Sequence, residues 1–188
     1  MEIQSNFKRE TLVMDSNKLI ENVNHPFGKF NGNEIKYVLQ ALDSENESGS
    51  WIQRFEEAFV EKLGVKYAIA VNTATSGLHA ALFAAGIKRG DEVIQPSKTV
   101  VMDSYVTIHL GATPVFADIN QDSWNIDVDE IEKKITSKTK AIIVVSLYGL
   151  PVDIDPIMRL AKKHNIIVID DSAETMVSKY KGKPAGTI

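Results

Sequence analysis

Two short segments of the chain carry residues whose types and spacing could do chemistry. In the first, residues 71–78, a strand-like run passes through small hydroxyl side chains into a helix-like run. The free N–H groups and the positive dipole end at a helix start favour a phosphate. Thr75 and Ser76 could add hydroxyl donors. The same residues could instead only cap the helix, and for this segment taken alone capping is the commoner role.

The second segment, residues 166–174, ends an apolar run in acidic residues. Asp170 and Asp171 close the run, and Glu174 follows three residues later. Ligands of open parallel sheets bind beyond the carboxyl ends of the strands, so these acids are expected at the ligand edge. They could hold a cationic ring, bind a metal or cap the next turn. No pair of histidines nearby would complete a metal site, so we predict none.

Alternating elements are expected to position these two segments. Short apolar, β-branched runs alternate with amphipathic stretches, which predicts an α/β fold with a mainly parallel sheet. The predicted strands cover residues 67–71, 92–95, 114–118, 141–145 and 166–170, and the predicted crossover helices cover residues 76–85, 101–110, 128–135 and 156–164. Two helices are predicted before them, at residues 33–42 and 51–63, and a hairpin after them, at residues 179–184.

Composition narrows the class of protein. The 188 residues are 44% hydrophobic and 24% charged, as in ordinary soluble domains. The net charge of −4 comes without a basic stripe, so neither a nucleic acid nor a membrane is expected as a partner. The absence of cysteine excludes disulfides and thiolate metal sites. The polar start lacks the apolar core of a signal peptide, which predicts a cytoplasmic location.

Taken together, these segments resemble the DegT/DnrJ/StrS family of nucleotide-sugar aminotransferases. The likeness runs from about Asn33 to Gly186 and includes residues 89–97, 111–118, 148–153 and 180–183. It implies the large domain of the aspartate-aminotransferase type, known as pyridoxal-phosphate (PLP) fold type I. On this basis we expect an N-terminal arm over residues 1–32, a truncated PLP-binding large domain over residues 33–188, and no C-terminal small domain.

The resemblance also implies a cofactor and its contacts. Asp171 falls where the family places the acid that holds the pyridine nitrogen of PLP, and Ala74 and Thr75 fall where it holds the phosphate. Glu174 stands at a position, usually Gln, that contacts the cofactor's ring oxygen; as an ionised acid it would repel that oxygen unless protonated or turned aside. Val100 stands where an aromatic residue commonly stacks on the ring.

The implied activity is transfer of an amino group, usually from glutamate, to a keto group of a nucleotide-linked sugar, in sugar or polysaccharide biosynthesis. Family members act as homodimers and carry a lysine, beyond the segment matched by residues 180–183, that links covalently to the cofactor. No lysine of this chain matches it, so we assign no catalytic residue and expect the chain alone to be inactive. A sugar dehydratase of the same fold and a non-catalytic binding or regulatory remnant remain alternatives.

Overall fold

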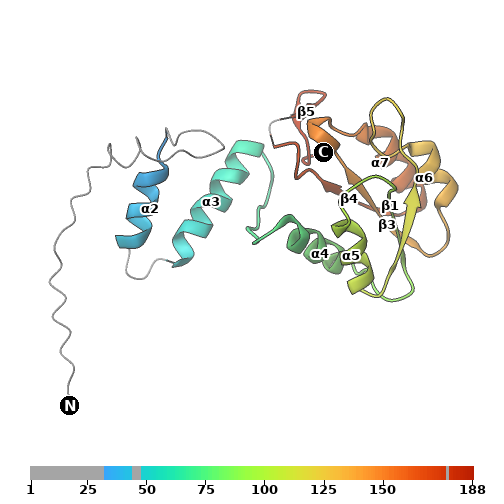
Figure 1. Ribbon diagram of the computed structural model, residues 1–188, viewed down its shortest axis with the longest axis horizontal. Helices are drawn as coiled ribbons and strands as arrows, with labels where there is room; N and C mark the ends of the chain where they lie inside the picture. The colour runs from blue at the N-terminus through green and yellow to red at the C-terminus, as the bar shows by residue number, and fades with distance from the viewer. Residues whose placement is uncertain (1–31, 44–47, 177) are drawn as a thin grey trace, which may run out of the picture. The chain divides into compact units, whose positions relative to one another are not determined.

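The computed structural model describes residues 32–43, 48–176 and 178–188 (Figure 1). The chain divides into two compact units, residues 1–54 and residues 55–188, with the boundary inside helix α3. Apart from Gly32, the predicted arm lies outside the described residues. The helices predicted at residues 33–42 and 51–63 are confirmed as α2 (Glu34–Asp43) and α3 (Ser48–Leu63).

The second unit is built on a sheet of four parallel strands in the order β2-β1-β3-β4. The strands are β1 (Glu92–Pro96), β2 (Thr113–Ala117), β3 (Thr139–Val145) and β4 (Ile167–Asp171). The helices between and before them are α4 (Ala74–Ala84), α5 (Met102–His109), α6 (Val128–Lys134) and α7 (Ile154–His164). The predicted α/β class, with its parallel sheet, is therefore confirmed.

Two hydrophobic cores lie on opposite faces of this sheet, because alternate residues of a strand point to opposite faces. Helices α4 and α5 cover one face and helices α6 and α7 cover the other (Figure 1). The first core joins Leu78, Leu82 and Val106 to Val93, Ala141, Ile143 and Val145. The second joins Ile131, Ile157 and Leu160 to Ile94, Ile142 and Val144. Strand β3, apolar on both faces, is the centre of the fold.

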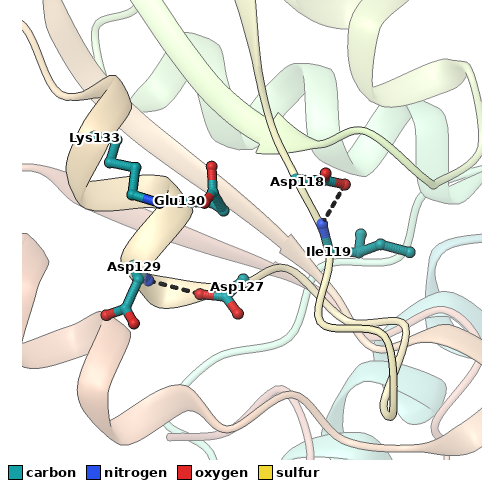
Figure 2. Close-up of polar contacts among 6 residues, drawn as sticks. All are labelled: Asp118, Ile119, Asp127, Asp129, Glu130 and Lys133. Atoms are coloured by element: carbon teal, nitrogen blue, oxygen red, sulfur yellow. Dashed lines mark hydrogen bonds and ion pairs between the residues drawn. The ribbon is translucent and has the colours of Figure 1, made fainter.

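The loop between β2 and α6 is fixed at both ends by carboxylates (Figure 2). The Asp118 side chain accepts a hydrogen bond from the N–H of Ile119 at 2.8 Å, where the chain leaves β2. The Asp127 side chain caps α6 by accepting from the N–H of Asp129 at 2.8 Å. An antiparallel bridge between Ile119 and Ile126 then closes the loop. This short, closed loop carries Trp124.

The prediction of a strand at residues 67–71 is wrong. Among the described strands none pairs with this segment, and its large side chains are exposed to solvent, Tyr67 at 73% and Ile69 at 82%. The N–H of Ala70 instead donates to the Glu56 side chain at 2.8 Å. A β-branched run favours extended backbone, but a strand also requires a neighbour for its N–H and C=O groups. Sequence pattern reports the first condition and not the second.

The hairpin predicted at residues 179–184 is confirmed as β5 (Lys179–Tyr180) paired with β6 (Lys183–Pro184). Its two central residues, Lys181 and Gly182, both have positive φ, at 49° and 84°. Positive φ at both positions is what the type I′ turn of a two-residue hairpin requires, and glycine meets that requirement without strain. The hairpin lies against the start of α7, because the Lys181 ammonium pairs with the Asp155 carboxylate.

Candidate cofactor site at the carboxyl edge of the sheet

The helix start that was expected to hold a phosphate is the N-terminus of α4. Thr73 is the N-cap, and its hydroxyl oxygen accepts a hydrogen bond from the N–H of Ser76 at 3.1 Å. Ala74 and Thr75 occupy the first turn, where backbone N–H groups have no intrahelical partner. Capping and phosphate binding are therefore compatible here, because the cap uses Ser76 and leaves the preceding N–H groups for a ligand.

Thr73→Ala is expected to lower the free energy of unfolding by about 1 kcal/mol, because the N–H of Ser76 would lose its side-chain acceptor. Denaturant unfolding of the 188-residue chain measures this change. Thr73→Ser keeps the hydroxyl and is the matched control, expected to retain most of the stability. An equal loss in both variants would show that the methyl group of Thr73, not its hydroxyl, supports the helix.

The acid expected to meet a cationic ring is nearly buried at the tip of β4. Asp171 is 7% exposed, and one of its carboxylate oxygens accepts from the N–H of Ala173 at 3.1 Å. Ile169, two residues earlier, packs in the core beneath α4 and α5. Because alternate residues share a face, Asp171 lies on that same face, and α4 is in contact with β4. The group expected to hold the phosphate, at the start of α4, and the group expected to hold the ring nitrogen, Asp171 of β4, therefore belong to elements that are in contact.

Asp170 faces the opposite side of the sheet. Val168, two residues before it, packs in the other core. The Asp170 carboxylate accepts a hydrogen bond from the Ser172 hydroxyl at 2.9 Å. Burial raises the pKa of Asp170, although hydrogen bonds from Ser172 and from the backbone of Gly186 oppose the rise. Of the two adjacent acids at this strand end, only Asp171 is directed to the side where α4 begins.

A second buried acid on this side of the sheet was missed by the sequence reasoning. Asp103 of α5 is fully buried, and one of its oxygens accepts from the Thr99 hydroxyl at 2.6 Å. Its other oxygen has no hydrogen-bond partner among the described residues. Burial raises its pKa to about 6, the Thr99 hydrogen bond opposes this, and the charge of Asp171 raises it further. The signal was present, since Asp103, Val106 and Thr107 share the buried stripe of α5.

The two remaining expected contacts lie at the surface. Glu174 is exposed, and its carboxylate accepts a hydrogen bond from the backbone N–H of Tyr148 at 2.6 Å. Val100 is 48% exposed, just before α5. One carboxylate oxygen of Glu174 is thus hydrogen-bonded to the loop after β3. Val100 offers a smaller apolar surface than an aromatic ring would.

The chemistry of this edge fits a phosphorylated, cationic ring. Free N–H groups at the start of α4 suit the phosphate, and the buried carboxylate of Asp171 suits a protonated ring nitrogen. In the described part of the chain, no group of three or more acidic or histidine side chains could hold a metal ion. None of the helices described is long and apolar enough to cross a membrane.

An α/β sheet with these features is that of the PLP fold type I enzymes. The chain belongs to the DegT/DnrJ/EryC1/StrS aminotransferase family, whose model matches residues 29–188. It is 48% identical over 158 residues to a GDP-perosamine synthase of Escherichia coli O157:H7, an alignment that covers 83% of this chain and 43% of the relative. The chain therefore spans less than half the length of that relative.

Solved structures give the same fold. An aminotransferase from Psychrobacter cryohalolentis superposes with a TM-score of 0.77 at 40% identity, covering 82% of this chain and 40% of that one. GDP-4-keto-6-deoxy-D-mannose-3-dehydratase from E. coli, with bound hydrated PLP, superposes with a TM-score of 0.78 at 29% identity, covering 84% and 42%. PLP is the cofactor of the family, and solved neighbours hold it or its amino form, PMP.

Proposed function

We propose that this chain is the cofactor-binding large domain of an enzyme that transfers an amino group to a keto group of a nucleotide-linked sugar. The observation that carries the proposal is the placement of Asp171 on the sheet face covered by α4, whose N-terminus offers free N–H groups. One cofactor with a phosphate at one end and a ring nitrogen at the other matches that pair of groups. Membership of the aminotransferase family supports the reaction class.

Each residue has a distinct proposed role. Bound PLP supplies an electron sink for reactions at an amino-bearing carbon. Ala74 and Thr75 hold its phosphate through backbone and hydroxyl donors, and the Asp171 carboxylate keeps its ring nitrogen protonated. Val100 contacts the ring. Glu174 orders the loop that carries Tyr148, because its carboxylate accepts a hydrogen bond from the backbone N–H of Tyr148. We assign no covalent role to any lysine of the 188 residues. The activity is proposed for the protein made from its complete reading frame, acting as a homodimer.

The proposed acceptor is a GDP-linked keto sugar. The support is the 48% identity to a GDP-perosamine synthase, whose name specifies a GDP-linked amino sugar. Glutamate is the proposed amino donor. A dehydratase is the second candidate, because a PLP-dependent sugar dehydratase shares the fold with a TM-score of 0.78. Both candidates use the same cofactor contacts, so the product distinguishes them.

The test combines the protein from the complete reading frame with PLP, GDP-4-keto-6-deoxymannose and glutamate carrying a labelled amino nitrogen. Mass spectrometry of the sugar nucleotide is the readout. Gain of the labelled nitrogen supports amino transfer, and loss of a sugar hydroxyl group without gain of nitrogen supports the dehydratase. The same reaction is run with keto sugars linked to UDP or dTDP. If every sugar nucleotide stays unchanged and none gains the labelled nitrogen, both candidates are contradicted.

A further inference from the structure

Beside the proposed cofactor site lies a group of three side chains that none of the cofactor contacts uses. The Lys98 ammonium nitrogen lies 3.3 Å from the ring centroid of Trp124 and 5.7 Å from that of Tyr148. The two rings meet edge to face, with centroids 5.9 Å apart. Within the described residues, Lys98 forms no ion pair with a carboxylate. We call Lys98, Trp124 and Tyr148 the lysine–aromatic cluster.

Both aromatic residues of the cluster sit in backbone conformations that such side chains rarely adopt. Trp124 has φ 61° and Tyr148 has φ 52°, in the left-handed region. Bulky residues are outliers there, and such strain persists only where surrounding structure fixes it, most often at functional sites. Within the described part of the chain, four non-glycine residues have positive φ, and two of them are these touching aromatics.

A buried amide holds the two strained loops together. The side chain of Asn125, next to Trp124, accepts from the N–H of Leu147 at 3.2 Å and donates to the carbonyl of Leu150 at 3.0 Å. These two contacts bracket Tyr148, whose own N–H donates to Glu174. The N–H of Trp124 donates to the carbonyl of Asn120 at 2.8 Å. The cluster is therefore preformed, which lowers the entropic cost of binding a ligand.

The cluster lies on the same edge of the sheet as Asp171. Lys98 follows β1 and Tyr148 follows β3, while Asp171 ends β4, and β3 lies between β1 and β4. Strands are spaced about 4.8 Å apart, so the strand that leads to Lys98 is about 10 Å from the strand of Asp171. A substrate reacting above Asp171 could place a group of its own at that distance.

We propose that the lysine–aromatic cluster binds the nucleoside diphosphate of the sugar nucleotide; the inference rests on the proposed function and names a subsite for its substrate. The Lys98 ammonium, held over Trp124 and lacking a carboxylate partner among the described residues, binds a phosphate. Tyr148 is 70% exposed, and its ring contacts the nucleoside, since aromatic rings stack on every base. An anionic amino donor such as glutamate would use the lysine but not the ring.

The test uses the protein from the complete reading frame and measures binding of GDP and of inorganic pyrophosphate by calorimetry. Lys98→Met is expected to weaken both about tenfold to a hundredfold, because a charge-assisted hydrogen bond is lost. Lys98→Arg keeps the charge and should retain binding. Tyr148→Asn removes the ring at a position where asparagine tolerates positive φ, and should weaken GDP but not pyrophosphate. Lys162→Met, an exposed lysine of α7, controls for net charge.

Kinetics separate this inference from the proposed function. Lys98→Met should raise KM for the sugar nucleotide by the same factor, with kcat and the half-reaction with glutamate unchanged. If wild type reacts with glutamate but Lys98→Met leaves GDP affinity within twofold, the subsite is refuted. A slowed glutamate half-reaction with normal GDP affinity would assign Lys98 to the amino donor and also refute it. Failure of wild type to react with any amino donor refutes the proposed function, while the calorimetry still decides the subsite.

Discussion

Replacing Asp171 by Asn is expected to lower the rate of amino transfer by about a thousandfold in the protein from the complete reading frame. Unit charges about 4 Å apart at an effective dielectric near 20 attract by about 4 kcal/mol. At about 1.36 kcal/mol per pKa unit, that attraction holds a ring nitrogen protonated across roughly three units. Asparagine keeps the size of Asp171 and removes the charge. Steady-state kinetics at saturating cofactor measures the loss.

Asp170→Asn is the matched control for this prediction. It changes the neighbouring acid, which faces the other side of the sheet and binds Ser172. We expect its effect on the rate to be small beside that of Asp171→Asn, whatever its effect on stability. The nitrogen NMR shift of isotopically labelled bound cofactor should report a deprotonated ring nitrogen only in Asp171→Asn. Equal losses in the two variants would mean that neither acid acts specifically on the ring.

Replacing Asp103 by Asn is expected to remove a pH dependence of stability. Burial raises the pKa of Asp103 from 3.8 to about 6. Because the folded-state pKa lies above the unfolded one, this carboxyl disfavours folding increasingly as pH rises from about 4 to about 6. The shift corresponds to about 3 kcal/mol, at about 1.36 kcal/mol per unit. The stability of the Asn variant relative to wild type should therefore rise by about 2–3 kcal/mol over that window, and stay constant above it.

Denaturant unfolding of the 188-residue chain at a series of pH values measures the difference in stability between the variant and wild type. Any effect of the amide side chain itself is the same at every pH, so only the change of this difference with pH reports on the Asp103 carboxyl. Asp155→Asn supplies a control of opposite sign. The Lys181 hydrogen bond lowers the pKa of Asp155, so that variant should lose stability relative to wild type as pH rises. A difference between Asp103→Asn and wild type that does not change with pH would show that Asp103 is ionised in the folded protein at no cost.

Much of the fold could be predicted because its signals are local. The runs that became β3 and β4 are apolar on both faces, which is typical of buried parallel strands, and the stretches between the predicted strands are long enough for crossover helices. Residues 67–71 show the limit of that reasoning. Their composition favours an extended backbone, but pairing depends on a neighbouring strand, and pairing is a property of the whole sheet.

The site could be predicted only in part, for a similar reason. Thr75 and Asp171 could be proposed from the sequence because each lies at a recognisable element boundary, and their roles toward the cofactor stay predictions. Which of Asp170 and Asp171 faces α4 follows from the strand's register in the sheet, which the structure supplies. Asp103 could have been found from its place on the apolar stripe of its helix. The meeting of Lys98, Trp124 and Tyr148 depends on three separate loops and on the buried Asn125, and no local pattern reports it.

A crystal structure of the protein with PMP, the amino form of the cofactor, would show whether one ligand spans the start of α4 and Asp171, because PMP binds without a covalent lysine link. We expect the phosphate within hydrogen-bond distance of the backbone N–H groups of Ala74 and Thr75, and the ring nitrogen within hydrogen-bond distance of the Asp171 carboxylate. A phosphate bound elsewhere, or a ring nitrogen directed away from Asp171, would contradict this expectation.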